Sequence, residues 1–344
     1  MLVFGFLIFI HELGHYITAR IFKVTISEFS IGMGPKLLWY DSKKTGIRYS
    51  LAMLPIGGFV AMVGEDEETD DPNAFNKKPA WQRFIITAAG AAVNLLAGFL
   101  AMIVLTCLIK IGGTTVGRVV PESDFTSTEG LDFELSNAHE LLREGDVITE
   151  VNGKRVVIRD ELSYEIMRHG HEAVSLTVIR DGKEEIIEGV RFPVMKSEGQ
   201  IFGFLNVSVR ETKKSFFEVM RYSTRNSLLN VRMVWESLYD LFTGRYTFAA
   251  VSGPVGISGA IGEAASAGAL SLLNIMIIIS INLGVMNLLP IPALDGGRLI
   301  VILAEMVTRK KIPPKIEGII NGVGLALLLA LSLVVMVKDV IQLI

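Results

Sequence analysis

The chain of 344 residues is 50% hydrophobic and only 20% charged, and its 33 basic residues nearly balance its 36 acidic ones. This balance gives no case for nucleic acid as a partner. The single cysteine, Cys107, excludes an internal disulfide framework and a cysteine-ligated zinc site. The mean hydropathy of +0.47 instead indicates a membrane protein.

Four stretches are apolar and long enough to cross a bilayer as helices, since a span needs about 20 such residues. They cover residues 1–22, 84–109, 264–294 and 318–337. Lysines and arginines gather in the two loops that follow the first and third stretches. Cytoplasmic loops carry such an excess, so both loops are predicted to be cytoplasmic and residues 111–263 extracytoplasmic.

The first stretch contains an HExxH motif, His11-Glu12-Leu13-Gly14-His15. Residues i and i+4 are neighbours on a helix, so the two imidazoles can grip one metal ion. Glu12 is then the candidate general base. A His and a Glu inside a membrane helix are costly and point to function. The motif therefore predicts hydrolysis of a substrate that itself lies in the membrane.

Residues 46–64 are mostly uncharged but too short to span a bilayer. Strand-like residues flank Pro55, Gly57 and Gly58, which predicts a β-hairpin with its turn at these residues. Backbone of this kind at membrane depth must be buried in protein or line a cavity. A hairpin on the cytoplasmic surface is the alternative.

Residues 111–210 read as a β-rich domain in which short valine-rich strands alternate with turns such as Asn152-Gly153 and Asp181-Gly182. The run 143–153 resembles the PDZ signature of a glycine–aspartate turn, a strand and an asparagine–glycine turn. PDZ domains bind peptides by adding a strand to a sheet edge. We therefore expect an extracytoplasmic PDZ domain that contacts a peptide or a substrate ectodomain.

Residues 211–263 are assigned to an amphipathic helix, over 214–243, and a linker. Aromatic residues with interspersed arginines favour a helix on the membrane surface. A helix that packs between domains is the alternative.

The third apolar stretch ends in Asn-Leu-Leu-Pro-Ile-Pro-Ala-Leu-Asp-Gly-Gly-Arg, which contains Asp295. Two prolines break the helix before this aspartate and two glycines loosen the backbone after it, so the carboxylate can turn inward. Catalytic zinc takes three protein ligands and keeps an open position. Asp295 is the candidate third ligand, although a helix cap would be the preferred interpretation of this residue alone.

An HExxH motif in the first apolar stretch and an LDGG motif in a later one, separated by a PDZ-like domain, together resemble the site-2 protease family of intramembrane metalloproteases. The resemblance covers essentially the whole chain. It implies a polytopic α-helical membrane protein with four transmembrane helices, an inserted β-rich PDZ domain and a membrane-associated β-hairpin. It also implies Zn2+ held by His11, His15 and Asp295, with Glu12 as general base.

The same resemblance implies a bacterial inner-membrane enzyme whose active site lies towards the cytoplasm. The hairpin would pair with an unwound substrate helix, and an anti-sigma factor or remnant signal peptides are the implied single-pass substrates. The residues expected to shape the substrate site are Asn282, Asn287, Pro290, Pro292, Gly57 and Gly58.

Three other interpretations remain open from the sequence. A membrane scaffold with a PDZ domain could carry an inactive metal site. A transporter could use proline-broken helices along its substrate path. A zinc protease could act on soluble peptides instead of membrane segments.

Overall fold

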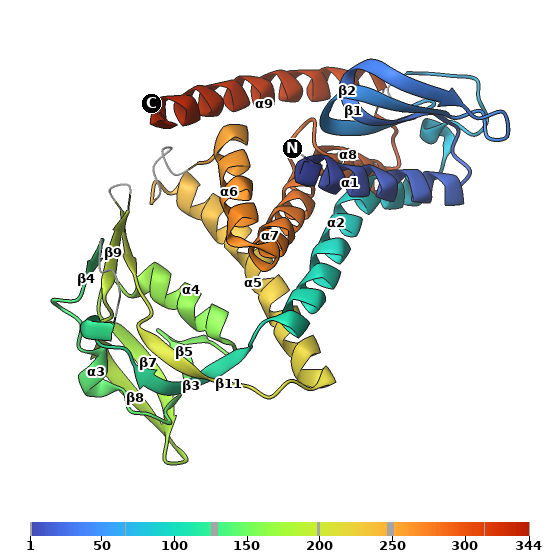
Figure 1. Ribbon diagram of the computed structural model, residues 1–344. Coiled ribbons are helices and arrows are strands. Elements are labelled where there is room, and N and C mark those ends of the chain that lie inside the picture. The colour runs from blue at the N-terminus through green and yellow to red at the C-terminus, as the bar shows by residue number, and fades with distance from the viewer. Residues whose placement is uncertain are drawn as a thin grey trace. The chain divides into compact units, whose positions relative to one another are not determined.

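The computed structural model describes residues 2–65, 67–124, 130–197, 200–245, 251–312 and 314–343 (Figure 1). The chain divides into two compact units. The first unit comprises Met1–Ala101 and Met233–Ile344, and the second comprises Met102–Arg232. Both boundaries fall inside long helices, α2 and α5.

Helices dominate the first unit: α1 (Leu2–Ile21), α2 (Ala80–Leu108), α6 (Pro254–Ala267), α7 (Ala269–Asn287), α8 (Asp295–Thr308) and α9 (Pro314–Leu343). Among the described residues, three helical segments are long and apolar enough to cross a membrane, namely Ala80–Leu108, Ala269–Asn287 and Ile316–Ile341. Helix α1 is not among these three. Its membrane span remains a prediction.

The predicted single stretch over 264–294 is divided into pieces. Helix α6 ends at Ala267 and α7 begins at Ala269, with Gly268 between them at φ +113°. Glycine adopts this conformation without a steric penalty, so the chain can change direction here. Helix α7 then ends at Asn287, because Pro290 and Pro292 follow and cannot continue a helix.

Two long antiparallel strands form a bent ribbon beside α1: β1 (Ile26–Asp41) and β2 (Arg48–Met62) (Figure 1). The outer half of β1, residues 36–41, pairs with the start of β2. The inner half, residues 26–31, pairs with the end of β2 at residues 58–62. Phe29 has partners in both halves of β2, so the inner half of β1 lies between them.

This pairing corrects the predicted hairpin within residues 46–64. Both halves of that stretch belong to β2, and each pairs with β1 instead of with the other. Gly57 and Gly58 lie inside β2, and Gly57 has φ +89°, which suits glycine. Residues 32–35 of β1 contain two glycines and a proline, so the sequence gives no clear strand pattern for the partner.

A hydrophobic core holds the ribbon against α1 and the start of α2. Its buried members come from the end of α1, from both strands, from the short helix η1 (Phe75–Lys77) and from α2, and include Ala19, Val24, Ile26, Phe29, Ile47, Val60, Met62, Phe75 and Ile86. This packing fixes the end of β2 beside the helix that carries the HExxH motif.

The second unit is built on a six-stranded sheet in the order β11-β3-β5-β7-β8, with β6 paired to β5. These strands are β3 (Gly112–Val119), β5 (Val147–Val151), β6 (Lys154–Arg155), β7 (Val174–Arg180), β8 (Lys183–Val190) and β11 (Val207–Glu211). A smaller sheet contains β4 (Leu131–Asp132), β9 (Val194–Ser197) and β10 (Gln200–Gly203). The helical elements are η2 (Glu122–Asp124), α3 (Ala138–Leu141), α4 (Arg159–His169) and α5 (Phe216–Phe242).

The two predicted hairpin turns join β5 to β6 and β7 to β8. Asn152 and Asp181 both have φ +49°, and the glycines after them also have positive φ, which is the conformation that tight hairpin turns require. Helix α5 occupies the predicted amphipathic stretch and exposes Phe216 and Phe217 by 73% and 80%. The PDZ assignment and the membrane position of α5 stay predictions.

Candidate metal centre

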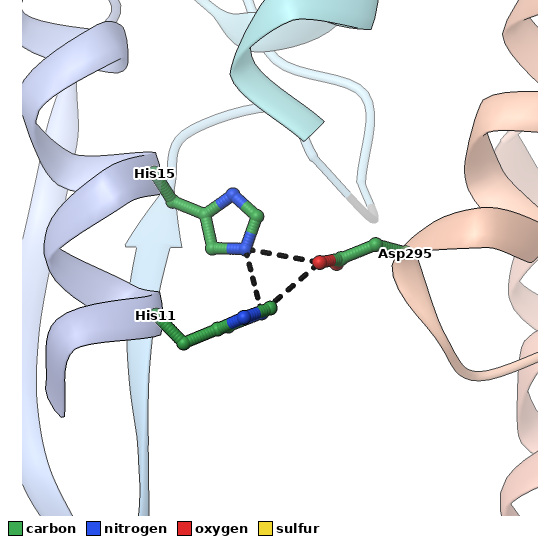
Figure 2. Close-up of side chains that lie close together, drawn as sticks. All are labelled: His11, His15 and Asp295. Atoms are coloured by element: carbon green, nitrogen blue, oxygen red, sulfur yellow. Dashed lines mark hydrogen bonds and ion pairs between the residues drawn. The ribbon is translucent and has the colours of Figure 1, made fainter. Parts of the chain in front are cut away.

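Helix α1 brings its two histidines together on one face. His11 and His15 are each only 8% exposed, and their Nε2 atoms lie 3.2 Å apart. The Nδ1 atom of His15 lies 2.8 Å from the backbone oxygen of Ile86 on α2, so it carries the proton and donates to that oxygen. The lone pair of His15 Nε2 therefore points towards His11 (Figure 2).

Asp295 approaches the same point from α8. Its Oδ2 lies 3.0 Å from Nε2 of His11 and 3.3 Å from Nε2 of His15 (Figure 2). Ala293 has φ +71° and turns the chain before the first residue of α8. The backbone N–H of Ala293 donates to Oδ1 of Asn321 on α9 at 3.3 Å, which holds this turn.

Two glycines let the loop pack directly on the first turn of α8. A Cβ atom on Gly296 would lie 2.0 Å from the backbone oxygen of Leu289, and one on Gly297 would lie 2.5 Å from that of Ile291. Real Cβ atoms do not come this close, so any side chain here would displace the loop and Asp295 with it. The glycines of the LDGG motif thus fix the position of the carboxylate.

The three side chains fit a zinc ion. Ligand atoms bind zinc at about 2.0–2.1 Å in a tetrahedron, which places neighbouring ligands about 3.3 Å apart. The separations of 3.0, 3.2 and 3.3 Å among the two Nε2 atoms and Oδ2 are close to this spacing. Within the described residues, Asp295 Oδ2 is buried and has no hydrogen-bond partner. Three electron-pair donors that converge in this way suit a cation bound between them.

Helix α2 lies directly behind the two histidines. A Cβ atom on Gly90 would lie 2.3 Å from Nε2 of His15 and 2.7 Å from Nε2 of His11. The hydrogen of a glycine therefore leaves space that any other residue would fill. Gly14 on α1 packs equally closely on Ala89, so the two helices touch at the metal centre.

Glu12 faces a cavity of about 610 Å³ that also borders the three candidate ligands. The end of β2 forms one wall, through residues 59–62. The backbone N–H of Val60 donates to the Glu12 carboxylate. A Cβ on Gly58 would lie 3.3 Å from Cγ of Glu12, so this glycine permits the strand to approach the carboxylate.

Arg298 lines the same cavity and was not predicted from the sequence. Its guanidinium pairs with Glu65, in the loop after β2, and its Nε donates to Oε1 of Glu317 on α9 at 3.0 Å. The side chain therefore joins three elements at the rim of the cavity. Its spacing of three residues from Asp295 was the available signal, because i and i+3 share a helix face.

The residues predicted to shape the substrate site are dispersed. Gly58 lies beside Glu12, and Pro292 packs against Gly324 of α9. Asn282 is exposed on α7, and Asn287 is the last residue of that helix. None of the six predicted residues is among the described residues that line the cavity, so their roles stay proposals.

Residues 1–331 match peptidase family M50. A protein of Clostridium acetobutylicum named as a candidate zinc metalloprotease is 37% identical over 343 residues, which cover 99% of this chain and 96% of that protein. The zinc metalloprotease RasP of Geobacillus kaustophilus is 28% identical, with 99% and 96% covered. The regulator of sigma-W protease RasP of Bacillus subtilis is 28% identical, with 99% and 97% covered.

The chain therefore belongs to peptidase family M50, the site-2 proteases, as the two motifs indicated. It is a zinc metalloprotease with the apolar helices of a membrane protein.

Proposed function

We propose that the chain is an intramembrane endopeptidase that cleaves transmembrane segments of single-pass membrane proteins. The zinc would be held by His11, His15 and Asp295, and Glu12 would be the general base. One observation carries the proposal: the ligand atoms of the three side chains lie within 4.8 Å of one another beside Glu12, in a chain whose described residues include three apolar helices of membrane-spanning length.

Zinc, when bound, supplies Lewis acidity that makes water nucleophilic near neutral pH and polarises a peptide carbonyl. Glu12 then accepts the proton of the attacking water and passes it to the leaving amine. Both histidines and Asp295 border the cavity, so a substrate in it would reach a zinc ion that they hold.

The wall formed by β2 suggests how a substrate is held. In the described part of the chain, residues 58–62 pair with β1 on one side only, and residues 59–62 line the cavity. A transmembrane helix hides its scissile carbonyls in its own hydrogen bonds, so it must unwind before cleavage. Pairing with the free edge of β2 would replace the hydrogen bonds that are lost. Asn282, Asn287, Pro290 and Pro292 would shape the path to this edge.

The basic loops support a metal centre towards the cytoplasm and residues 111–263 outside, where a PDZ domain would contact a peptide or a substrate ectodomain. The name of the B. subtilis relative, a regulator of sigma-W protease, supports an anti-sigma factor as one substrate. Remnant signal peptides are the second class. These assignments imply a bacterial inner-membrane protein.

The test uses the full chain in lipid vesicles with a single-pass model substrate and, separately, soluble casein. Glu12→Gln is expected to keep its zinc and lose activity by at least roughly 100-fold, because general-base catalysis contributes 10²–10⁴-fold. Chelation should abolish cleavage and added zinc should restore it. Cleavage of casein with an intact membrane substrate would contradict the proposal, and so would full activity of Glu12→Gln.

A further inference from the structure

Asn94 lies on α2 one turn after Gly90, beside the Nδ1 atom of His11. It is fully buried, at 0% exposure, and its amide nitrogen lies 3.4 Å from Nδ1 of His11. The hydroxyl of Ser280 on α7 donates to the backbone oxygen of Asn94 at 2.8 Å, which anchors this turn of the helix. Asn94 is therefore held where it can reach only one ring nitrogen of this histidine.

The protonation of His11 follows from its position. Its Nε2 faces Asp295 and His15, so a metal at this point requires the lone pair of Nε2 and leaves the proton on Nδ1. A buried N–H needs an acceptor. For His15, that acceptor is the backbone oxygen of Ile86. Asn94 is the side chain within reach of the corresponding atom of His11.

The side-chain amide of Asn94 also contains an unsatisfied hydrogen-bond acceptor. Its Oδ1 is buried without a hydrogen-bond partner among the described residues. Turning the amide by 180° exchanges its oxygen and nitrogen without moving any other atom. The oxygen then accepts from Nδ1–H of His11, and two unsatisfied buried groups satisfy each other.

We infer that Asn94 is a positioning residue for the metal centre: its Oδ1 accepts a hydrogen bond from Nδ1–H of His11 and so aims Nε2 at the zinc. Partners of this kind fix the tautomer and the ring orientation of a ligand histidine. The inference rests on the proposed ligand set. It adds α2 to α1 and α8 as an element that determines the geometry of the centre.

The test measures zinc affinity of the purified full chain by competition with a chelator, and the visible spectrum of the Co2+-substituted protein. Asn94→Ala and Asn94→Ser are expected to weaken zinc binding by roughly 10- to 100-fold and to change the Co2+ spectrum, since outer partners contribute about this much. Asn94→Asp keeps an acceptor and should retain zinc affinity close to that of the unmodified chain.

Thr106→Val is the matched control, because Thr106 is also buried on α2 but its hydroxyl donates to Met102 of its own helix and accepts from Ser223 of α5, with no contact to His11. It should leave both measurements unchanged. Equal losses in Asn94→Asp and Asn94→Ala would show that an acceptor is not what matters, and unchanged affinity in Asn94→Ala would also overturn the inference. His11→Ala separates the two proposals: if it binds zinc normally, the ligand set itself is wrong.

Discussion

At the scale of single residues, the candidate metal centre depends on a glycine, Gly90, whose lack of a side chain leaves room between the two histidines. Gly90 is the one position on α2 where a Cβ atom would fall between the two imidazoles, at 2.3 and 2.7 Å from their Nε2 atoms. Both contacts are shorter than any real Cβ makes, so an added methyl group and the bound ion cannot occupy this space together.

Gly90→Ala is therefore expected to lower the zinc content of the purified protein by at least about 10-fold, the lower end of the effect of disturbing a ligand's orientation. Metal analysis after dialysis would measure it. Gly98→Ala is the control, because its Cβ would meet the Ile281 side chain at 2.8 Å and the backbone oxygen of Ile277 at 3.6 Å, and neither imidazole. Zinc retained by Gly90→Ala would contradict the geometry described for α2.

In the second unit, Asp146 is a buried carboxylate that accepts two hydrogen bonds from Arg180, at 2.9 and 2.7 Å, and one from the backbone N–H of Arg143, at 2.8 Å. Burial raises the pKa of this carboxyl, but the hydrogen bonds from Arg180 and Arg143 outweigh burial and hold the pKa below its ordinary value. Its stabilising contribution is thus present above the unfolded-state pKa of about 3.9 and is lost as the pH falls through the folded-state value.

Asp146→Asn should destabilise the protein by about 1.5–3 kcal/mol at pH 7, the usual range for a hydrogen bond to a charged group, because Arg180 loses its buried carboxylate partner and keeps only Glu185 and the Leu141 oxygen. The difference from the unmodified chain should shrink as the pH falls towards 3. Thermal unfolding followed by circular dichroism would measure both. Asp181→Asn, in the exposed turn of β7 and β8, should stay within about 0.5 kcal/mol. A pH-independent difference would rule out the ionised pair as the cause.

At the scale of elements, Arg298 joins α8 to α9 and to the loop after β2. It is three residues from Asp295, so its ion pairs resist any shift of the turn that carries the carboxylate. Arg298→Gln is expected to lower kcat by roughly 10- to 100-fold, since misplacement by about 1 Å can cost that much.

The zinc content of Arg298→Gln should be retained, because none of the three ligands is removed. Arg298→Lys keeps the charge but loses the planar guanidinium, so its kcat should lie between those of the unmodified chain and Arg298→Gln. Measuring kcat and metal content on the same preparations tests this. A variant that loses zinc together with activity would show that Arg298 maintains the centre itself.

The sequence predicted the three candidate ligands that the structure brings together, because two short motifs carry them and the pair of motifs links Asp295 to the histidines. The spacing of His11 and His15 needs only a helix, and Asp295 stands alone among prolines and glycines. The two hairpin turns of the second unit were predictable for the same reason. The contributions of Gly90 and Arg298 depend on which faces of the helices pack against each other. That packing has no periodic signature in the sequence.

Strand pairing was the weakest part of the prediction. The inner half of β1, residues 26–31, pairs with residues 58–62, which are distant in the sequence. The register also shifts several times along the two strands. Alternation of side chains specifies a register only where one face is buried and the pairing is regular. Exposed apolar residues on both strands, such as Leu38 and Met53, removed that alternation.

At the scale of the whole molecule, the charge pattern predicts which loops face the cytoplasm, and labelling of single cysteines can test this prediction. Cys107 is the only cysteine, so Cys107→Ser gives a clean background. Lys43→Cys and Asp181→Cys then introduce thiols at exposed turns, the first in the ribbon and the second in the β-rich unit.

An impermeant maleimide added to intact spheroplasts should label Asp181→Cys at once and Lys43→Cys only after lysis, because the basic loops are expected in the cytoplasm. Cleavage activity of each variant serves as the control for folding. The reverse labelling pattern would overturn the assigned orientation.

The open edge of β2 has a consequence for selectivity. Amide groups are the same in every polypeptide, so a substrate strand that pairs with residues 58–62, as proposed above, would be bound with little regard to its side chains. The choice among substrates would then depend on how easily each transmembrane helix unwinds. Glycine, proline and small polar residues destabilise a transmembrane helix. Substrates rich in these residues should therefore be cleaved fastest, whichever residues flank the scissile bond.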